Sequence, residues 1–459
     1  MAVYYTEKVE TAYRKSTEHT ITLRGKEIVY EAVAEDHIIP GEDGKPAYTI
    51  FTFSYLVKNG EKDRPVLFFF NGGPGSNSAW LHMGFYGPRI LKMAENGMPP
   101  EKGPYELRDN VECLLDVCDL VAIDPVDAGF SRLFDNCYQK ECFYDEGDAR
   151  SVSKAIRHWI AGYGREKSVK FISGESYGST RASLLGWLLQ DLQPIGGAVH
   201  IGPGYTGKLD IPRNVKDLPP LAATHWYYSK DPAKGTLSEW MEHCYDFLYG
   251  EYLAAWHMGT QCPKERIAQT AEKLAYFTGL PASYYVENRL WVSREYFREH
   301  YLEAEGKKLG SFDTRFTLPQ DSDAEPFGAA FDPPVEACRE QYFREELGLD
   351  LERVYRKSAM MDVDEYDWKF ESEPDMAGAN GIAYQKNPKM RFFFGTGYYD
   401  SVATVENTRF GVTHTDIPTE AVTMKEYESG HAVYADEMSR RQLAADIRAF
   451  LVEALEANR

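Results

Sequence analysis

The stretch Gly174-Glu175-Ser176-Tyr177-Gly178 decides how the rest of the chain is interpreted. It follows the short apolar run 169–173 and precedes a helix-forming segment that begins at Thr180, so the order predicts strand, tight turn and helix. Glycines on both sides of a serine let the strand and the helix approach closely, which lifts the serine hydroxyl out of the backbone. We therefore expect Ser176 to be a nucleophile. The alternative interpretation is an ordinary surface serine.

Length and composition describe a large globular protein with an acidic balance. The chain has 459 residues, of which 43% are hydrophobic and 27% charged, as is typical of a folded protein with a substantial core. The net charge of −20 argues against a nucleic-acid partner and against an anionic membrane surface, because both need a positive protein surface. The N-terminal residues form no apolar signal segment and no run is long enough to cross a membrane, so we expect a cytoplasmic protein.

The seven cysteines do not form the dense pattern of a disulfide framework. Their odd number suits mostly free thiols, although Cys137 and Cys142 are close enough in sequence to form a bridge in an oxidising compartment. No Cys/His cluster has the spacing of a zinc site, and we expect neither a metal nor a cofactor. The sequence does not decide the oligomeric state, and a homodimer stays open.

Two kinds of apolar pattern predict the elements of the fold. Residues 21–33 and 47–57 alternate apolar and polar side chains, which predicts antiparallel strands. Apolar residues at helical spacing predict helices over 149–160 and 435–455. Short continuous apolar runs are typical of strands buried on both faces of a parallel sheet. These runs are 66–70, 120–123, 171–172, 198–201 and 392–394.

The segment from about Leu209 to Asp375 interrupts this pattern. It is rich in aromatic residues and helix formers and lacks the short strand runs. We therefore predict an α/β protein with a mostly parallel central sheet flanked by helices. In this division residues 1–208 and 376–459 form the core, and residues 209–375 form a largely helical cap. Loops at the C-terminal edge of such a sheet carry function, so we expect the inner face of the cap to set substrate choice.

Two further residues fit the chemistry that Ser176 needs. A serine hydroxyl requires a base to remove its proton, and the usual base is a histidine oriented by a carboxylate. Asp400 directly follows the run 392–394, and His431 lies between the apolar-alternating run 421–424 and the last helix. The order serine, aspartate, histidine is the one expected for the α/β-hydrolase fold. We predict that these three residues are catalytic. The alternative for His431 is a histidine in a surface loop.

The segment Asn71-Gly72-Gly73-Pro74-Gly75 follows the predicted strand 66–70. Two glycines before a proline can aim backbone N–H groups inward. An oxyanion hole needs one N–H from such a loop and one from the residue after the nucleophile, here Tyr177. A phosphate-binding loop is the alternative interpretation, but Pro74 removes a donor and no Gly-Lys-Ser/Thr follows.

Taken in order, four segments resemble the motifs of the serine carboxypeptidase family. They are Asn71-Gly72-Gly73-Pro74-Gly75, Gly174-Glu175-Ser176-Tyr177-Gly178, Gly397-Tyr398-Tyr399-Asp400 and Gly430-His431-Ala432-Val433. The resemblance covers about residues 50–210 and 385–455 and does not extend to the insertion. It implies an α/β-hydrolase fold with a helical insertion. It also implies a serine-type peptidase that releases C-terminal residues from a peptide substrate through an acyl-enzyme intermediate.

The resemblance also assigns roles to individual residues. It implies three catalytic residues, two oxyanion-hole residues and two residues that bind the terminal carboxylate of the peptide. These are Ser176 (nucleophile), His431 (base), Asp400 (its partner), Gly73 and Tyr177 (oxyanion N–H groups), and Asn71 and Glu175 (carboxylate). A carboxyl group such as that of Glu175 can bind a carboxylate only while it is protonated, and this favours acid conditions.

The chain departs from the family pattern close to the predicted site. A second glutamate that usually partners the one beside the serine is replaced by Phe85, a tryptophan before the glycine loop by Phe69, and a cysteine after it by Ser76. The missing glutamate leaves open an esterase or acyltransferase with the same triad. A catalytically silent binding scaffold is the second alternative.

An arginine could compensate for the missing glutamate, because a guanidinium binds a carboxylate bidentately. The candidates are Arg89, Arg132 and Arg181, and the position of Arg181 on the helix after Ser176 favours it. The alternative is an arginine that is solvated or paired within the structure.

Overall fold

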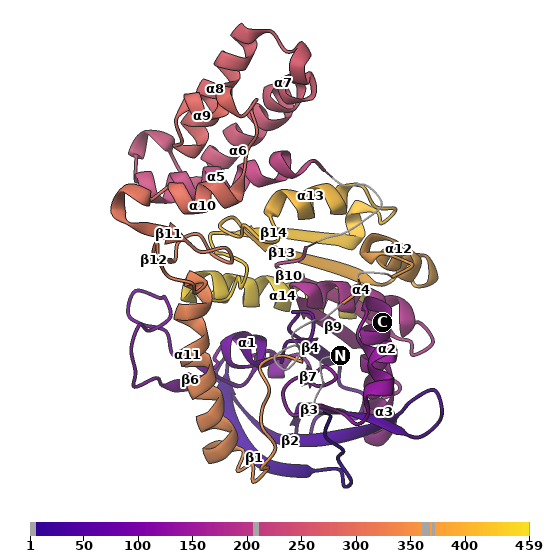
Figure 1. Cartoon of the computed structure of the whole chain (residues 1–459). Helices are drawn as coiled ribbons and strands as arrows, with labels where there is room; N and C mark the ends of the chain where they lie inside the picture. The colour runs from indigo at the N-terminus through magenta and orange to yellow at the C-terminus, as the bar shows by residue number, and fades with distance from the viewer. Residues whose placement is uncertain (1–5, 205–210, 360–367, 370–371, 459) are drawn as a thin grey trace.

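The computed structural model describes residues 6–204, 211–359, 368–369 and 372–458 (Figure 1). Its centre is a ten-stranded sheet in the order β1-β2-β3-β7-β4-β9-β10-β13-β14, with β8 paired to β3. Strands β1, β2, β3 and β7 pair antiparallel, and every pair from β7 to β14 is parallel. The predicted mostly parallel central sheet is confirmed.

The strands lie where the two apolar patterns predicted them. The alternating residues belong to β1 (Arg14–Leu23), β2 (Lys26–Pro40) and β3 (Pro46–Val57). The continuous runs belong to β4 (Val66–Phe70), β7 (Asp119–Asp124), β9 (Lys170–Glu175), β10 (Ile195–Ile201) and β13 (Arg391–Gly397). The parallel edge is β14 (Val422–Tyr427), and β8 is Arg132–Leu133.

Helices cover both faces of the sheet, which is why the central strands are apolar on both sides. In β4, Leu67 and Phe69 join one buried cluster, whereas Val66, Phe68 and Phe70 join another. The second cluster includes side chains of α3 (Asp145–Tyr163), α4 (Tyr177–Leu188) and α12 (Met376–Lys386). The first includes side chains of α11 (Pro326–Gln341) and α14 (Glu437–Ala457).

Local capping residues set one boundary of each of the two helices predicted from apolar spacing. Helix α3 stops at Gly164, which takes the left-handed conformation (φ 63°, ψ 39°) that glycine adopts without steric cost. Helix α14 begins after Asp436, whose carboxylate accepts a hydrogen bond from the Ser439 N–H. Their first turns are acidic, which suits the positive end of the helix dipole.

The segment predicted as a cap has two parts in the structure. Six helices lie together at the top of Figure 1 and share their own hydrophobic cluster. They are α5 (Arg213–Ser229), α6 (Leu237–Phe247), α7 (Leu253–His257), α8 (Lys264–Thr278), α9 (Ala282–Glu287) and α10 (Arg294–His300). A short hairpin of β11 (Lys307–Leu309) and β12 (Thr317–Pro319) follows, and α11 then packs against the sheet.

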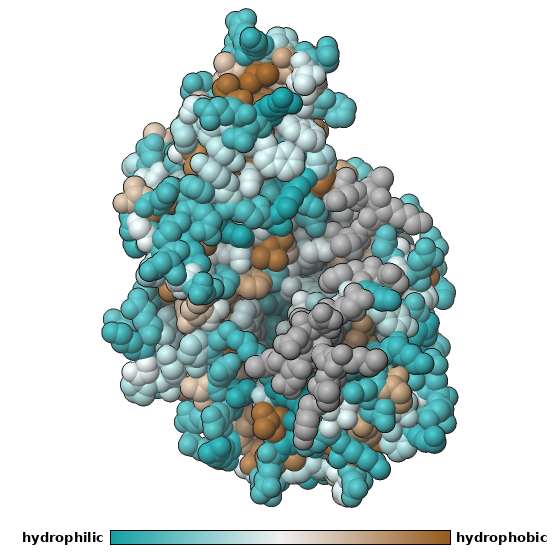
Figure 2. All heavy atoms as spheres, in the orientation of Figure 1, coloured by the Kyte–Doolittle hydropathy of each residue, from teal (hydrophilic) through white to brown (hydrophobic). Residues whose placement is uncertain are grey.

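The predicted boundary at residues 208 and 209 lies within 205–210, outside the described residues, and the three-part division stays a prediction. Figure 2 shows hydrophilic residues over most of the face in view, with hydrophobic residues in separate groups. Within the described ranges, no helix combines the length and the apolar character needed to cross a bilayer.

Candidate active site

Ser176 lies at the turn between β9 and α4. Its backbone has φ 57° and ψ −128°, a region that residues with a side chain rarely adopt. The turn is tight because a Cβ atom on Gly174 would lie 1.9 Å from the Gly178 carbonyl oxygen. The predicted strand, turn and helix are therefore present, and the strained turn carries the serine.

The glycine loop after β4 presses directly against this turn. A Cβ atom on Gly72 would lie 2.6 Å from both the Glu175 carbonyl oxygen and the Tyr177 nitrogen, so only glycine fits there. Gly73 lines the same pocket as Ser176. The structure thus places Gly73 in the wall of the pocket that Ser176 lines and brings its neighbour Gly72 against the Tyr177 nitrogen.

Asp400 and His431 meet after two neighbouring parallel strands. Asp400 follows β13 and His431 follows β14, and the His431 Nδ1 atom lies 2.6 Å from the Asp400 Oδ2 atom. Both side chains are buried. Burial alone would lower the pKa of His431, but the carboxylates of Asp400, Glu175 and Glu325 together more than offset this, so the pKa is raised above its usual value.

Ser176 and His431 line one pocket of about 150 Å³. The His431 Nε2 atom is buried and has no hydrogen-bond partner among the described residues, so the hydrogen bond to the Ser176 hydroxyl is not formed. In enzymes without substrate this bond is often long or poorly aligned. Asn71, Glu175 and Gly73 line the same pocket.

Two side chains donate hydrogen bonds to the buried Glu175 carboxylate. Asn71 Nδ2 donates to Glu175 Oε2 at 2.8 Å, and the Tyr434 hydroxyl donates to the same oxygen. Phe85 stacks on the Tyr434 ring, with centroids 5.5 Å apart. Burial raises the pKa of Glu175 to about 7, although both donors act in the opposite direction.

The hypothesis that Arg181 binds a substrate carboxylate is wrong. Its guanidinium is fully buried behind the serine turn, where Nε lies 2.6 Å from Asp148 Oδ2 and Nη1 donates to the Asn71 carbonyl at 2.8 Å. Arg89 and Arg132 are also occupied, by Glu346 and Glu7 respectively. Arg181 therefore supports the glycine loop and does not face the pocket.

Sequence reasoning missed the residues that complete the pocket wall. Trp80 and Phe312 form its aromatic side, and Lys357 is the one lysine or arginine among the described residues that line it. The Lys357 ammonium lies 2.6 Å from Asp332, which also accepts a hydrogen bond from the Trp80 indole at 2.8 Å. No local pattern marks these residues, because they lie in the segment predicted as a cap or in other segments that only the fold brings together.

The backbone of the segment around Lys357 is bound to the glycine loop. The Ala359 N–H donates to the Gly75 carbonyl at 2.9 Å, and the Asn77 N–H donates to the Lys357 carbonyl at 3.1 Å. Asn77 Nδ2 also donates to the Arg356 carbonyl at 2.9 Å. These contacts fix the start of the Lys357 side chain beside the pocket, while its end is about half exposed.

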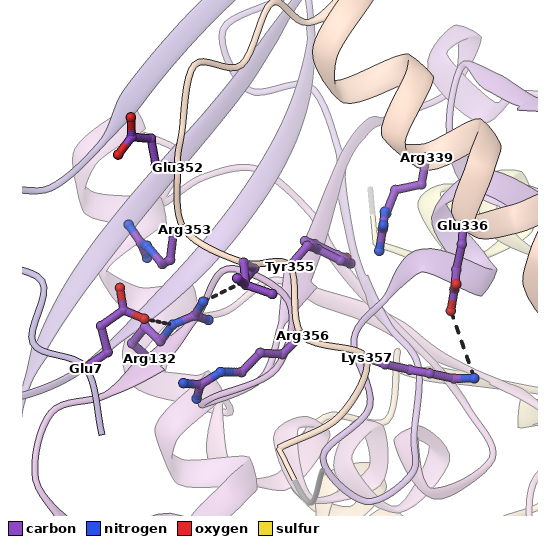
Figure 3. Close-up of a pocket in the computed structure, with 10 residues that line it drawn as sticks. Glu7, Arg132, Glu336, Arg339, Glu352, Arg353, Tyr355, Arg356 and Lys357 are labelled. Atoms are coloured by element: carbon purple, nitrogen blue, oxygen red, sulfur yellow. Dashed lines mark hydrogen bonds and ion pairs between the residues drawn. The ribbon is translucent and has the colours of Figure 1, made fainter. Parts of the chain in front are cut away.

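Lys357 also lines a larger hollow of about 700 Å³ (Figure 3). Arginines line it, but most are already paired. Arg132 binds Glu7, Arg353 binds Asp36 and Arg356 binds Asp127. Because these pairs use most of the positive charge and no predicted catalytic residue lines the hollow, it is not the candidate active site.

The described residues contain neither a metal-binding cluster nor a disulfide. Among the described residues, no group of three or more His, Cys, Asp or Glu side chains could hold a metal ion. All seven cysteines lie in described parts of the chain and are free thiols, including Cys137 and Cys142.

Comparisons with known proteins place the fold. No protein-family model and no curated protein matches the sequence. Among solved structures, the prohormone-processing carboxypeptidase Kex1 from Saccharomyces cerevisiae aligns with a TM-score of 0.55 and 13% identity, over 91% of each chain. A proline iminopeptidase from Mycobacterium smegmatis aligns with a TM-score of 0.40 and 11% identity, over 92% of this chain and 99% of that one. The sheet order, the serine turn after β9 and the likeness to Kex1 together show that this chain has the α/β-hydrolase fold.

Proposed function

We propose that the protein is a serine hydrolase that cleaves peptides through an acyl-enzyme intermediate and releases a C-terminal residue. The observation that carries this proposal is the 2.6 Å hydrogen bond between His431 and Asp400, beside a pocket that His431 shares with the strained Ser176. A serine, a histidine and a buried carboxylate are the parts that this kind of nucleophilic acyl transfer uses, and their order in the chain is the one found in the α/β-hydrolase fold.

In this proposal a named side chain performs each step of the acyl-transfer reaction. The Ser176 hydroxyl attacks the scissile carbonyl carbon while His431 Nε2 accepts its proton, which requires closure of the gap to the hydroxyl. Asp400 keeps the proton of the imidazole on Nδ1 and stabilises the imidazolium. His431 then donates the proton to the leaving amine, and water hydrolyses the acyl-serine by the same steps in reverse.

The remaining predicted residues bind the substrate. The N–H groups of Gly73 and Tyr177 stabilise the negative oxygen of the tetrahedral intermediate. Loss of one such donor costs about 3–4 kcal/mol in a serine protease with a different fold. Asn71 and a protonated Glu175 bind the terminal carboxylate of the peptide. The Glu175 pKa of about 7 supports this role, because the group can then donate a hydrogen bond under mildly acid conditions.

One observation favours a second candidate function. Phe85 fills the position of the usual second glutamate and is packed against Tyr434, so this part of the site offers no second carboxyl group. An esterase or acyltransferase would need the same serine, histidine and aspartate but no terminal-carboxylate contact. We keep this function as the alternative.

Covalent labelling tests the shared chemistry. A fluorophosphonate probe should modify the wild-type protein at Ser176, and Ser176→Ala should abolish the label. A wild-type protein that stays unlabelled under conditions where it is folded would contradict both hydrolase candidates.

Substrate comparison then separates the two candidates. A blocked dipeptide acid, its amide and its ester present the same acyl group with different terminal groups. A peptidase that releases C-terminal residues should have the highest kcat/KM for the acid. Turnover of the ester alone would favour the esterase or acyltransferase.

A further inference from the structure

The Asp400 carboxylate is held by two backbone N–H groups of its own loop. Its Oδ1 atom accepts hydrogen bonds from Val402 N at 2.7 Å and from Ala403 N at 2.9 Å, while Oδ2 faces His431. The direction of the carboxylate therefore depends on how these two peptide groups are oriented.

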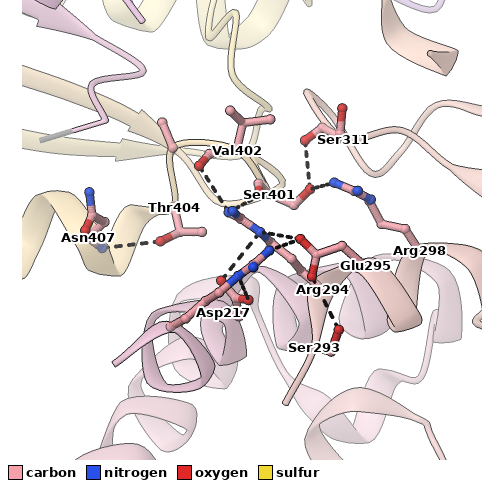
Figure 4. Close-up of polar contacts among 12 residues, drawn as sticks. Asp217, Ser293, Arg294, Glu295, Arg298, Ser311, Ser401, Val402, Thr404 and Asn407 are labelled. Carbon is pink, nitrogen blue, oxygen red and sulfur yellow. Dashed lines mark hydrogen bonds and ion pairs between the residues drawn. The ribbon is translucent and has the colours of Figure 1, made fainter. Parts of the chain in front are cut away.

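Arg294, from helix α10 of the insertion, binds the opposite ends of the same two peptide groups (Figure 4). Its Nη1 atom donates to the Ser401 carbonyl and, at 3.1 Å, to the Val402 carbonyl. The Ser401 carbonyl belongs to the peptide group that carries the Val402 N–H, and the Val402 carbonyl to the one that carries the Ala403 N–H. Because a peptide group is planar, a fixed carbonyl fixes the direction of the N–H on its other side.

The charge of Arg294 also acts along these peptide groups. A guanidinium at a carbonyl oxygen forms a charge-assisted hydrogen bond and polarises the peptide group, which makes its N–H a stronger donor. A second contact holds the loop in place, because Arg298 Nη1 donates to the Ser401 hydroxyl at 3.1 Å. That hydroxyl in turn donates to the Ser311 carbonyl at 2.8 Å.

Charged groups on neighbouring elements surround Arg294. Asp217 on α5 is fully buried, and its Oδ1 atom lies 3.8 Å from Arg294 Nε. Glu295 lies 3.4 Å from the same nitrogen. Arg213 is 3.7 Å from Asp217 but binds no carbonyl of the Asp400 loop in the described structure, so it shares the charge environment without the loop contact.

We propose that Arg294 is a positioning residue for Asp400, acting through the two peptide groups that hold the carboxylate. The helical insertion thereby takes part in building the catalytic centre and does not only cover it. This inference rests on the proposed function of Ser176, Asp400 and His431. A loosened Asp400 would support the imidazolium less, so the pKa of His431 would fall.

The test compares Arg294→Met and Arg294→Lys with the matched control Arg213→Met. The rate of fluorophosphonate labelling at Ser176 is measured as a function of pH, because it needs the base but no peptide substrate. We expect Arg294→Met to label about tenfold more slowly, with its acid limb at lower pH, and Arg294→Lys to retain part of the rate. Arg213→Met should stay within about twofold of the wild type.

A second readout does not depend on catalysis. The proton on His431 Nδ1 should give a low-field NMR resonance, assigned by its loss in His431→Ala, and this resonance should move upfield in Arg294→Met and less in Arg294→Lys.

If the wild type does not label, the proposed function fails, and the resonance still decides the role of Arg294. Unchanged labelling profiles and an unchanged resonance in both Arg294 variants would overturn the inference, as would an equal loss in Arg213→Met. If Arg294→Met does not fold, Arg294→Lys alone decides in the same way.

Discussion

Glu175, one residue before the proposed nucleophile Ser176, has a carboxyl group whose charge depends on pH near neutrality. Burial raises its pKa to about 7, so it is protonated at lower pH and ionised at higher pH. A protonated Glu175 can donate to a substrate carboxylate, whereas an ionised one repels it. We expect KM for a blocked dipeptide acid to rise as the pH increases through about 7, with a smaller change for the corresponding amide.

Tyr434 provides the variant for this prediction. Its hydroxyl donates to Glu175 and stabilises the charged form, so Tyr434→Phe should raise the pKa of Glu175 and move the increase in KM to higher pH. Tyr427→Phe is the control, because the Tyr427 hydroxyl binds Asp446. A KM for the acid that does not change between pH 5 and 8 would show that Glu175 does not contact the terminal group.

Lys357 is the second residue whose charge faces the candidate pocket. It is half exposed and already paired with Asp332, so a contact with a substrate carboxylate should contribute only about 1 kcal/mol, or about fivefold in KM. We expect Lys357→Met to raise KM for the peptide acid by this factor and to leave the amide unchanged, while Lys357→Arg should behave like the wild type. Lys389→Met, at an exposed lysine outside the pocket, is the control. Equal effects on acid and amide would exclude a charge contact.

At the scale of elements, a buried ion pair joins α3 to α4 behind the serine turn. Arg181→Met would leave the Asp148 carboxylate buried without its cation, a change that costs about 3–5 kcal/mol in comparable pairs. We expect a clear drop in the midpoint of thermal unfolding and an unchanged ratio of KM values for peptide acid and amide. Arg150→Met removes an exposed pair within α3 and should cost less than about 1 kcal/mol. Similar midpoints for the two variants would contradict a structural role for Arg181.

The elements that the sequence predicted are those whose pattern is local. Strand β4 is a continuous apolar run because both its faces are buried, and α3 repeats apolar residues until Gly164 ends it. The turn at Ser176 was predictable for the same reason, since its glycines are adjacent in sequence. Helix α11 shows what a local pattern does not predict, namely where a helix packs. It belongs to the predicted cap segment, yet its side chains join the hydrophobic cluster of the sheet.

At the scale of the whole molecule, the contacts that could not be predicted join segments far apart in sequence. The Tyr434 hydroxyl binds Glu175 across 259 residues, and Arg294 binds the Ser401 carbonyl across 107. Asp400 and His431 were predictable as a pair only because parallel strands bring their following loops to one edge of the sheet. No comparable pattern in the sequence predicts the hydrogen-bond partner of a tyrosine or an arginine such as Tyr434 or Arg294.

The segment predicted as a cap also contacts the rest of the molecule through a titratable side chain. Glu406 on α13 (Val405–Thr413) is buried and accepts a hydrogen bond from the hydroxyl of Tyr249 in that segment. Burial raises the pKa of Glu406 to about 7, well above the value of an unfolded chain. The folded state therefore binds this proton more tightly, so the resulting stability is fully present at pH 4 and is lost as the pH rises through about 7.

Glu406→Gln removes this titration while keeping the shape of the side chain. The linkage corresponds to about 3 kcal/mol at most, so the unfolding midpoint of the wild type should fall by a few degrees between pH 5 and 8 through this group. We expect the midpoint of Glu406→Gln, relative to the wild type, to increase over the same range. Glu420→Gln, at an exposed glutamate, should follow the wild type at each pH. A difference between Glu406→Gln and the wild type that does not depend on pH would mean that Glu406 stays in one protonation state and that this contact with the insertion does not sense pH.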